Sequence, residues 1–317
     1  MQKGENIVSI ALAGVVLLAV VAVQRRWNPA SLEDVASSAE NFLLTTTGIR
    51  GEVPEIAGYE RLQAFDLGDY RAAFYRANPA PLVFAPGRFV IYDAADHAAY
   101  RLDTLEGSRD SWSALYDFTG RHGLPVPGRG RDTYARDLTG DGSPDIIVAQ
   151  FSGGHNCCTV ASILELGKDA VKPIGRIEGI DGLPFEGLEV RRLSKAGWQL
   201  VVRRPSVTSC GTGSDADLLA VYDFTSDSFQ DQTLKFEGYL EEVLRQDLGK
   251  WRQEKNRNLG LLQNIAVDYA AVGQKDAAKR FFALNLNPYM AILRDQGTDP
   301  NDCIDSIESL VDRLPMP

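Results

Sequence analysis

The sequence is poor in the residues and motifs that most often mark an active site. It contains three histidines and four cysteines in 317 residues. The motifs G-x-S-x-G, H-E-x-x-H, Walker A and G-x-G-x-x-G are all absent. These absences exclude the common sequence signatures of serine hydrolases, zinc peptidases, P-loop nucleotide hydrolases and dinucleotide-binding enzymes. We therefore expect a binding role rather than catalysis.

Positive charge is also scarce. The chain has 33 lysines and arginines against 43 aspartates and glutamates, which gives a net charge of −10. A nucleic-acid-binding surface needs basic residues to neutralise phosphates, so nucleic acid is excluded as an expected partner. The hydrophobic fraction of 44% is ordinary for a folded protein, and 317 residues can form one large or two modest domains.

Only one long apolar run occurs, from Ile7 to Val23, and Arg25-Arg26-Trp27 follows it. As a helix this run would extend ~25 Å, close to the ~30 Å hydrocarbon core of a bilayer. The run ends in Ala22-Val23-Gln24-Arg25-Arg26, which makes a poor small-x-small cleavage site. We therefore expect residues 1–28 to be a retained anchor through which the protein contacts the membrane.

The sequence gives competing indications of the side of the membrane on which the body lies. Lys3 precedes the span and two arginines follow it, which weakly favours a body on the cytoplasmic face. The cysteines and the acidic loop described below favour an oxidising, calcium-rich compartment. We expect an extracytoplasmic body, periplasmic or extracellular, with the cytoplasmic face as the alternative.

The rest of the chain divides by periodicity. Residues 29–56 contain a short helix, Ser31–Leu44, and a linker. In residues 57–237, short runs of alternating hydrophobic and polar residues are separated by glycine, proline and aspartate. This pattern predicts antiparallel strands. Residues 238–317 are helical in pattern, so the predicted fold class is α+β. The expected strands are Arg88–Tyr92, Ala114–Phe118, Asp145–Phe151, Thr159–Leu166, Leu188–Leu193, Trp198–Arg203 and Leu218–Phe224.

A short Tyr-Asp segment recurs in the β-rich region. Leu115–Thr119 is repeated as Val221–Thr225, and Ile91–Ala94 is a weaker third copy. Such a strand end followed by a turn is common in propeller blades, but three copies are too few to close a ring of four or more blades. We expect propeller-like hairpins without a full ring, and the alternative is unrelated strands that end in similar turns.

Four helices are expected at the C-terminus. Tyr269, Gly273, Ala278 and Phe282 have spacings that resemble a tetratricopeptide repeat. The resemblance implies a helical hairpin around Gly273 that packs on its neighbours, and a plain hairpin without a peptide-binding role is the alternative. The expected helices are Tyr239–Trp251, Leu259–Val272, Asp276–Leu286 and Pro300–Leu314.

The segment 137–145 has the composition of a cation-binding loop. Oxygen-bearing side chains occupy alternate positions around Gly142, which a tight turn could direct toward one hard cation such as Ca²⁺. The loop leads into an apolar strand. The expected ligands are Asp137, Thr139, Asp141, Ser143 and Asp145.

This loop resembles those of the FG-GAP/VCBS repeat families, whose pattern is D-x-[DN]-x-D-G-x-x-D before a strand. Thr139 departs from that pattern, since those families carry Asn or Asp there. The resemblance covers one loop and implies a structural Ca²⁺. The alternative is an acidic turn held by Asx-type hydrogen bonds without an ion.

The cysteines predict a disulfide in an oxidising compartment. Cys157 and Cys158 are adjacent, and Cys210 lies in a similar glycine-flanked segment. We expect Cys210 to pair with one of the two adjacent cysteines, with a vicinal Cys157–Cys158 bond as the next option and Cys303 free and buried. A Zn or Cu site that combines His155 with Cys210 and an adjacent cysteine is a weaker alternative.

Together these features predict a membrane-anchored, extracytoplasmic binding protein. We expect it to act as a scaffold or accessory subunit with protein partners in a membrane-associated assembly, and to carry a structural Ca²⁺. The alternative from another class is an exported hydrolase whose carboxylates come together only in the fold.

Overall fold

A computed structural model describes residues 53–78, 87–103, 112–118, 131–151, 159–182, 186–195, 197–206, 208, 210, 216–253, 255 and 257–315. The expected anchor, Ile7–Val23, and the expected helix Ser31–Leu44 lie outside the described residues. Within the described ranges, no helix combines the length and apolar character needed to cross a membrane.

Among the described residues, the β part consists of three four-stranded antiparallel sheets, and the strands of each sheet are consecutive in the sequence. The first sheet is formed by β1 (Tyr59–Asp66), β2 (Arg71–Ala77), β3 (Gly87–Tyr92) and β4 (Ala98–Asp103). The second contains β5 (Trp112–Leu115), β6 (Asp145–Phe151), β7 (Thr159–Leu166) and β8 (Val171–Ile180). The third contains β9 (Leu188–Arg191), β10 (Gln199–Ser206), β11 (Ala216–Thr225) and β12 (Ser228–Asp231).

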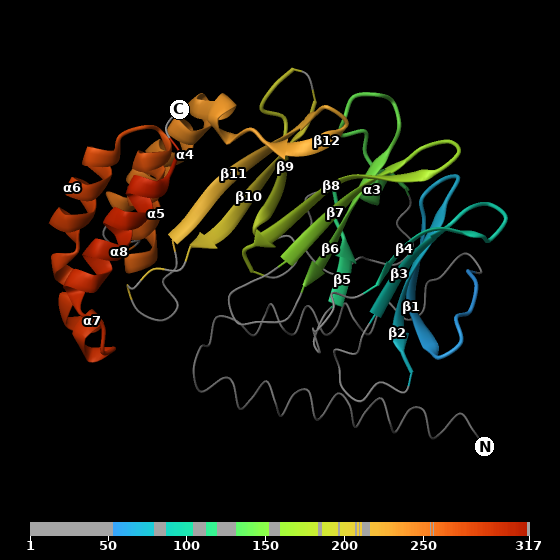
Figure 1. Cartoon of the computed structure of the whole chain (residues 1–317), viewed down its shortest axis with the longest axis horizontal. Coiled ribbons are helices and arrows are strands. Elements are labelled where there is room, and N and C mark those ends of the chain that lie inside the picture. The colour runs from blue at the N-terminus through green and yellow to red at the C-terminus, as the bar shows by residue number, and fades with distance from the viewer. Residues whose placement is uncertain are drawn as a thin grey trace.

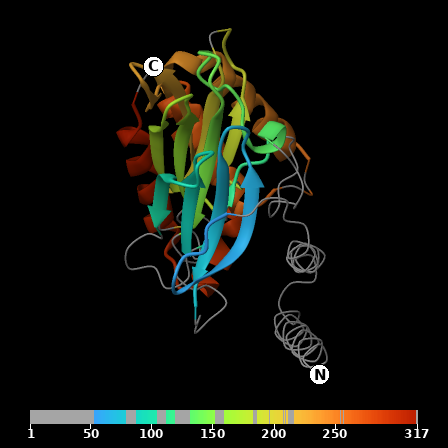
Figure 2. The ribbon, with the colours of Figure 1, turned by 90° about the vertical axis from the view of Figure 1, so that its right-hand side faces the viewer.

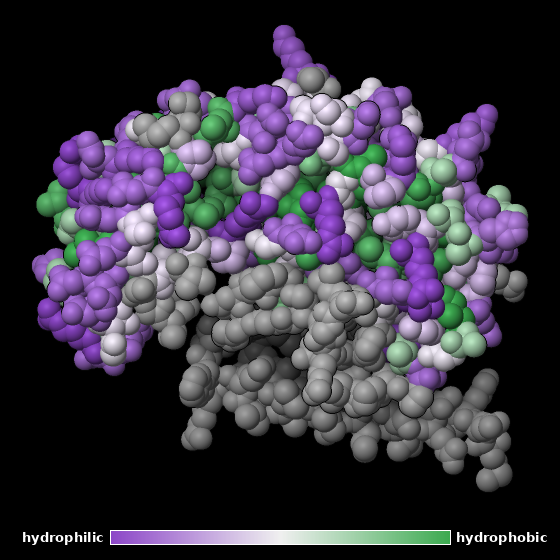
Figure 3. All heavy atoms as spheres, in the orientation of Figure 1, coloured by the Kyte–Doolittle hydropathy of each residue, from purple (hydrophilic) through white to green (hydrophobic). Residues whose placement is uncertain are grey.

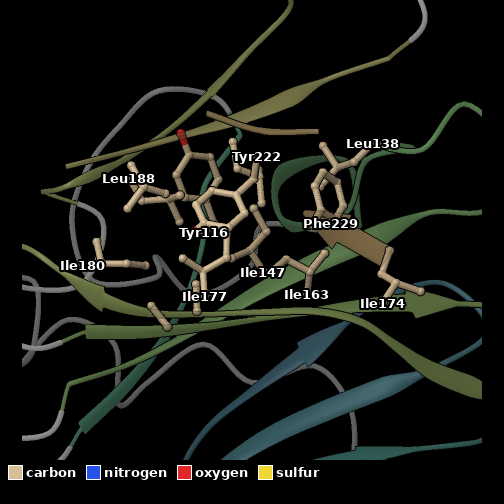
Figure 4. Packing of buried hydrophobic residues seen from close by; sticks show 14 of the residues in the cluster. Tyr116, Leu138, Ile147, Ile163, Ile174, Ile177, Ile180, Leu188, Tyr222 and Phe229 are labelled. Atoms are coloured by element: carbon tan, nitrogen blue, oxygen red, sulfur yellow. The ribbon is translucent and has the colours of Figure 1, made fainter. Parts of the chain in front are cut away.

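The three sheets stack face to face, with the second sheet in the middle (Figures 1 and 2). Strand β6 shows why its sequence is a continuous apolar run. Ile146 and Val148 pack toward the first sheet, while Ile147 and Ala149 pack toward the third. Successive side chains of a strand point to opposite faces, so a strand that is covered on both faces is apolar at every position. Figure 4 shows the core between the second and third sheets.

The helices that follow the third sheet form a layer at one end of this stack. The layer begins with η3 (Thr233–Phe236), and its α5 packs against β11 of the third sheet (Figure 1). On the face shown in Figure 3, hydrophilic residues cover most of the helical layer. The remaining elements are α4 (Glu237–Trp251), α5 (Leu259–Ala271), α6 (Lys275–Asn285), η5 (Asn287–Tyr289), α7 (Met290–Asp295) and α8 (Pro300–Arg313).

The structure confirms the α+β class and the antiparallel β part. It also confirms the helical hairpin, because α5 and α6 meet around Gly273, which has a φ of +76°. Ala278 and Phe282 of this hairpin are 0% and 1% exposed in the helical core. The hairpin packs on its neighbours, as a single helical pair must, because it cannot bury its own apolar face.

The Tyr-Asp copies do not occupy equivalent places. Tyr92 ends β3 and Tyr222 lies in β11, which are the third strands of their sheets. Tyr116 instead follows β5, the first strand of the second sheet. The pair with the greatest sequence similarity, 115–119 and 221–225, therefore does not mark a structural repeat.

The predicted partner of Cys210 is wrong. Cys210 forms a disulfide with Cys303 of α8, and the two Cα atoms are 4.4 Å apart. Both cysteines are fully buried, so the expectation of a free Cys303 is also wrong, although its burial is confirmed. The prediction rested on similar glycine-flanked segments, which say nothing about the distance between the cysteines in the fold. In the structure, the helical layer packs on the third sheet and brings α8 beside residue 210. Cys157 and Cys158 lie outside the described residues.

Candidate cation-binding loop

The acidic loop connects α3 (Arg131–Tyr134) to β6 and is closed at its base by two backbone hydrogen bonds. The amide of Arg136 donates to the Asp145 carbonyl at 2.9 Å, and the Asp145 amide donates to the Arg136 carbonyl at 2.8 Å. Gly140 and Gly142 adopt φ values of +85° and +90°. Only glycine enters this region without strain, so the two glycines allow a nine-residue loop to turn tightly.

Two of the expected ligands bind the loop's own backbone. Oδ1 of Asp137 accepts a hydrogen bond from the Gly140 amide at 2.6 Å, and Oδ2 accepts one from the Gly142 amide at 3.0 Å. Oδ1 of Asp141 accepts from the Ser143 amide at 2.7 Å. These are Asx-type hydrogen bonds, which hold an acidic turn together without an ion.

Asp145 has a different environment, because it is 0% exposed. Its Oδ2 accepts a hydrogen bond from the Leu138 amide at 2.8 Å, while its Oδ1 is buried without a hydrogen-bond partner. Burial raises the pKa of Asp145 to about 7; the amides of Leu138 and Thr139 oppose this shift, and the charges of Asp141 and Asp137 add to it. The hydroxyl of Thr139 is likewise buried without a partner. Two oxygens of the loop are thus buried without a hydrogen-bond partner.

The second and third sheets hold this loop in place. Leu138 is fully buried between them (Figure 4), and its carbonyl accepts a hydrogen bond from the Trp198 amide at 3.2 Å. A Cβ at Gly197 would lie 3.1 Å from that carbonyl, so glycine permits this close approach. The guanidinium of Arg136 lies 4.8 Å from the centroid of the Trp198 ring and 5.2 Å from that of Phe118. Sequence patterns gave no signal for the contact between the loop and Trp198, because it joins different sheets.

No model of a known protein family, no curated protein and no solved structure matches this chain.

The site must therefore be judged on its own geometry. All five expected ligands lie in one loop, but within the described ranges no three His, Cys, Asp or Glu side chains are grouped so that they could hold a metal ion. The unpaired oxygens of Asp145 and Thr139 fit a hard cation. The loop offers the all-oxygen donor set that Ca²⁺ prefers, but its acidic side chains are not gathered around one point.

The alternative of a Zn or Cu site lacks Cys210, one of its expected ligands. The sulfur of Cys210 is bonded to Cys303 and is not a thiolate. His97 is on the surface with its side chain 81% exposed. His155 lies outside the described residues.

Proposed function

We propose that the protein is a membrane-anchored, extracytoplasmic scaffold or accessory subunit of a membrane-associated assembly. The observation that carries this proposal is the row of three face-to-face sheets with a helical layer at one end. Consecutive four-stranded meanders that stack in this way resemble the blades of a propeller that does not close into a ring. Such a body presents broad, rigid surfaces to protein partners, and the N-terminal anchor would hold it at the membrane.

The buried Cys210–Cys303 disulfide supports the extracytoplasmic placement. Disulfides form and persist in oxidising compartments and are rare where thiols are kept reduced. This support is independent of the weak charge bias around the anchor, which favours the opposite side.

The unpaired oxygens of Asp145 and Thr139 support the structural Ca²⁺. A bound cation would compensate the buried Asp145 carboxylate, with the remaining oxygens supplied by Asp137, Asp141 and Ser143. The cation would order a loop that already connects the second and third sheets through Leu138 and Trp198. Its part in the proposed function is to stiffen the stack rather than to catalyse a reaction.

Protease protection of the full-length protein in its native membrane tests the placement. We expect the body to be digested from the outside of intact cells or spheroplasts, while a short anchored fragment stays with the membrane after carbonate extraction. Digestion only after the membrane is permeabilised would place the body on the cytoplasmic face and contradict the proposal.

Chemical cross-linking in the same membranes tests the scaffold role. We expect the full-length protein to form cross-linked species of defined mass with other proteins, and the same species to be recovered after mild detergent extraction. A protein that remains monomeric under both conditions would contradict a subunit role.

A further inference from the structure

The helical layer attaches to the third sheet through polar contacts as well as apolar ones. Asn264 of α5 accepts a hydrogen bond from the Asp217 amide of β11 at 2.9 Å. The hydroxyl of Thr208 donates to the side-chain oxygen of Gln263 at 2.7 Å, and this contact is buried. Side chains on this side of α5 therefore meet β11 and the segment between β10 and β11 rather than water.

Asp268 lies one turn further along α5 from Asn264. It is 7% exposed, and its Oδ2 atom is buried without a hydrogen-bond partner. Burial of an unsatisfied carboxylate is costly when it is ionised, and much less costly when it carries a proton. The fold thus places an ionisable group where its charged form is poorly accommodated.

The charged groups around Asp268 come from three packed elements. α4 supplies Asp247, which is 4% exposed, and Lys250, whose Nζ lies 2.5 Å from Asp247 Oδ1. β10 supplies Arg203 and β11 supplies Asp217, and these two are paired at 3.9 Å. Each cation thus already has its own aspartate, and Asp268 is the surplus acid.

We call these five residues, Asp268, Asp247, Lys250, Arg203 and Asp217, the Asp268 junction. Within it, burial raises the pKa of Asp268 to about 8, and the charge of Asp247 adds to this shift. Arg203 and Lys250 oppose the shift. Tyr239 of α4 also lies near enough for the Asp268 charge to raise its own pKa, although burial is the main cause there.

We propose that the Asp268 junction is a pH-responsive latch that holds α4 and α5 more tightly on the third sheet as the pH falls. In the closed latch Asp268 carries a proton, which compensates for its burial beside Asp247. In the open latch Asp268 reaches water and releases that proton to solvent. Each fall in pH therefore favours the closed form, and the Cys210–Cys303 bond keeps α8 tied to residue 210 in both forms.

The sign and the pH range follow from linkage. The closed form retains its proton up to about pH 8, whereas a solvated aspartate loses its proton near pH 3.9. Between these values the closed form binds about one more proton than the open form, so the opening equilibrium rises about tenfold per pH unit. Above about pH 8 both forms are ionised and opening no longer depends on this group.

Hydrogen exchange of the full-length, disulfide-intact protein tests the latch. Protection factors, corrected for the intrinsic pH dependence of exchange, are compared at pH 5.5 and pH 7.5. For wild type we expect protection in α4 and α5 to fall about a hundredfold as the pH rises from 5.5 to 7.5. The fall is smaller only where exchange at pH 5.5 already occurs through global unfolding. Asp145 at the start of β6 also has a raised pKa, so comparison with the Asp268→Asn variant, rather than with β6, isolates the contribution of Asp268.

Asp268→Asn replaces the acid with a side chain of similar shape that cannot ionise. We expect its protection in α4 and α5 to be independent of pH between 5.5 and 7.5. Asp305→Asn, on an exposed position of α8, is the matched control and should behave like wild type. A fall in Asp268→Asn as large as in wild type would overturn the proposal.

Asp247→Asn gives a second test that does not depend on replacing Asp268. Removal of the neighbouring charge should lower the pH at which the closed form loses its proton, so the pH dependence should level off at a lower pH than in wild type. An unchanged profile in Asp247→Asn, with a normal fold by circular dichroism, would also overturn the proposal.

Discussion

Two buried carboxylates, Asp145 and Asp268, each leave one oxygen without a hydrogen-bond partner. Asp145 lies in a loop that is rich in other oxygens, so a cation can compensate its charge. Asp268 lies between a helix and a sheet beside Asp247, so a proton is the simpler compensation. Buried polar groups are usually hydrogen-bonded in folded proteins, so an unsatisfied carboxylate calls for an explanation.

At the residue scale, Ca²⁺ should stabilise wild type through Asp145. We expect the melting temperature at pH 8 to be higher in Ca²⁺ than in a chelator, because the cation offsets the buried charge. Asp145→Asn should abolish this difference, while Asp169→Asn in an exposed turn should preserve it. Identical melting of wild type with Ca²⁺ and with chelator, measured by calorimetry, would show that the loop is an ion-free turn.

Gly142→Ala should destabilise the loop through its backbone. A Cβ at this position meets no atom within 4 Å, so the cost comes from the φ of +90° rather than from a clash. Left-handed backbone costs a non-glycine residue about 1–2 kcal/mol. Urea unfolding should show a loss of this size with an unchanged m-value, and an unaltered midpoint would contradict the geometry of the turn.

At the scale of elements, local periodicity predicted some segments well and missed others. Asp145–Phe151 and Thr159–Leu166 were predicted at their observed ends, since both are apolar runs between turn residues. Strands β1, β2, β4, β8 and β12 were not predicted. β4 and β12 lie at sheet edges and carry charged residues, and β8 is interrupted by a proline, so their hydrophobic patterns are weak.

Helix ends were predicted within a few residues because caps and periodicity are local. Asn258 caps α5 by accepting from the Leu261 amide, and Asp299 caps α8 by accepting from the Asn301 amide. The short α7 was missed, since six residues are too few to show a 3.6-residue period.

Gly249→Ala should stabilise α4. Gly249 lies inside this helix, and a Cβ there meets no atom within 4 Å. Glycine inside a helix costs about 0.8–1.0 kcal/mol relative to alanine, so the free energy of unfolding should rise by up to that amount. Gly142→Ala is the natural comparison, because the same chemical change at a positive φ should have the opposite sign. Destabilisation by Gly249→Ala in urea unfolding would contradict the open space that the structure shows around this position.

At the scale of the whole molecule, the disulfide is the covalent tie between the third sheet and the helical layer. It closes a loop with a sequence separation of 93 residues. In the chain-entropy model, closure of a loop of about this length stabilises a protein by ~4–5 kcal/mol.

The double variant Cys210→Ala/Cys303→Ala should therefore unfold at lower urea concentration, with the largest loss of hydrogen-exchange protection in the helical layer. Peptide mapping of the unreduced protein provides the direct check. A bond between Cys210 and Cys157 or Cys158 would contradict the structure, and two free thiols at 210 and 303 would remove the main support for an extracytoplasmic body.

The sequence alone determined the features that depend on neighbours along the chain. These are the acidic turn around Gly142, the apolar runs of the central strands, the helical hairpin at Gly273 and the α+β class. Each is set by side chains a few residues apart, through backbone conformation and the periods of strand and helix.

Only the tertiary structure decided the features that join distant segments. The partner of Cys210, the contact of Leu138 with Trp198 and the burial of Asp268 all depend on how three sheets and a helical layer stack. Asp268 is an ordinary acid in a helical sequence. It becomes an unsatisfied buried carboxylate only because α5 packs against β11 and α4, and a pattern of neighbouring residues cannot encode a contact made across the stack.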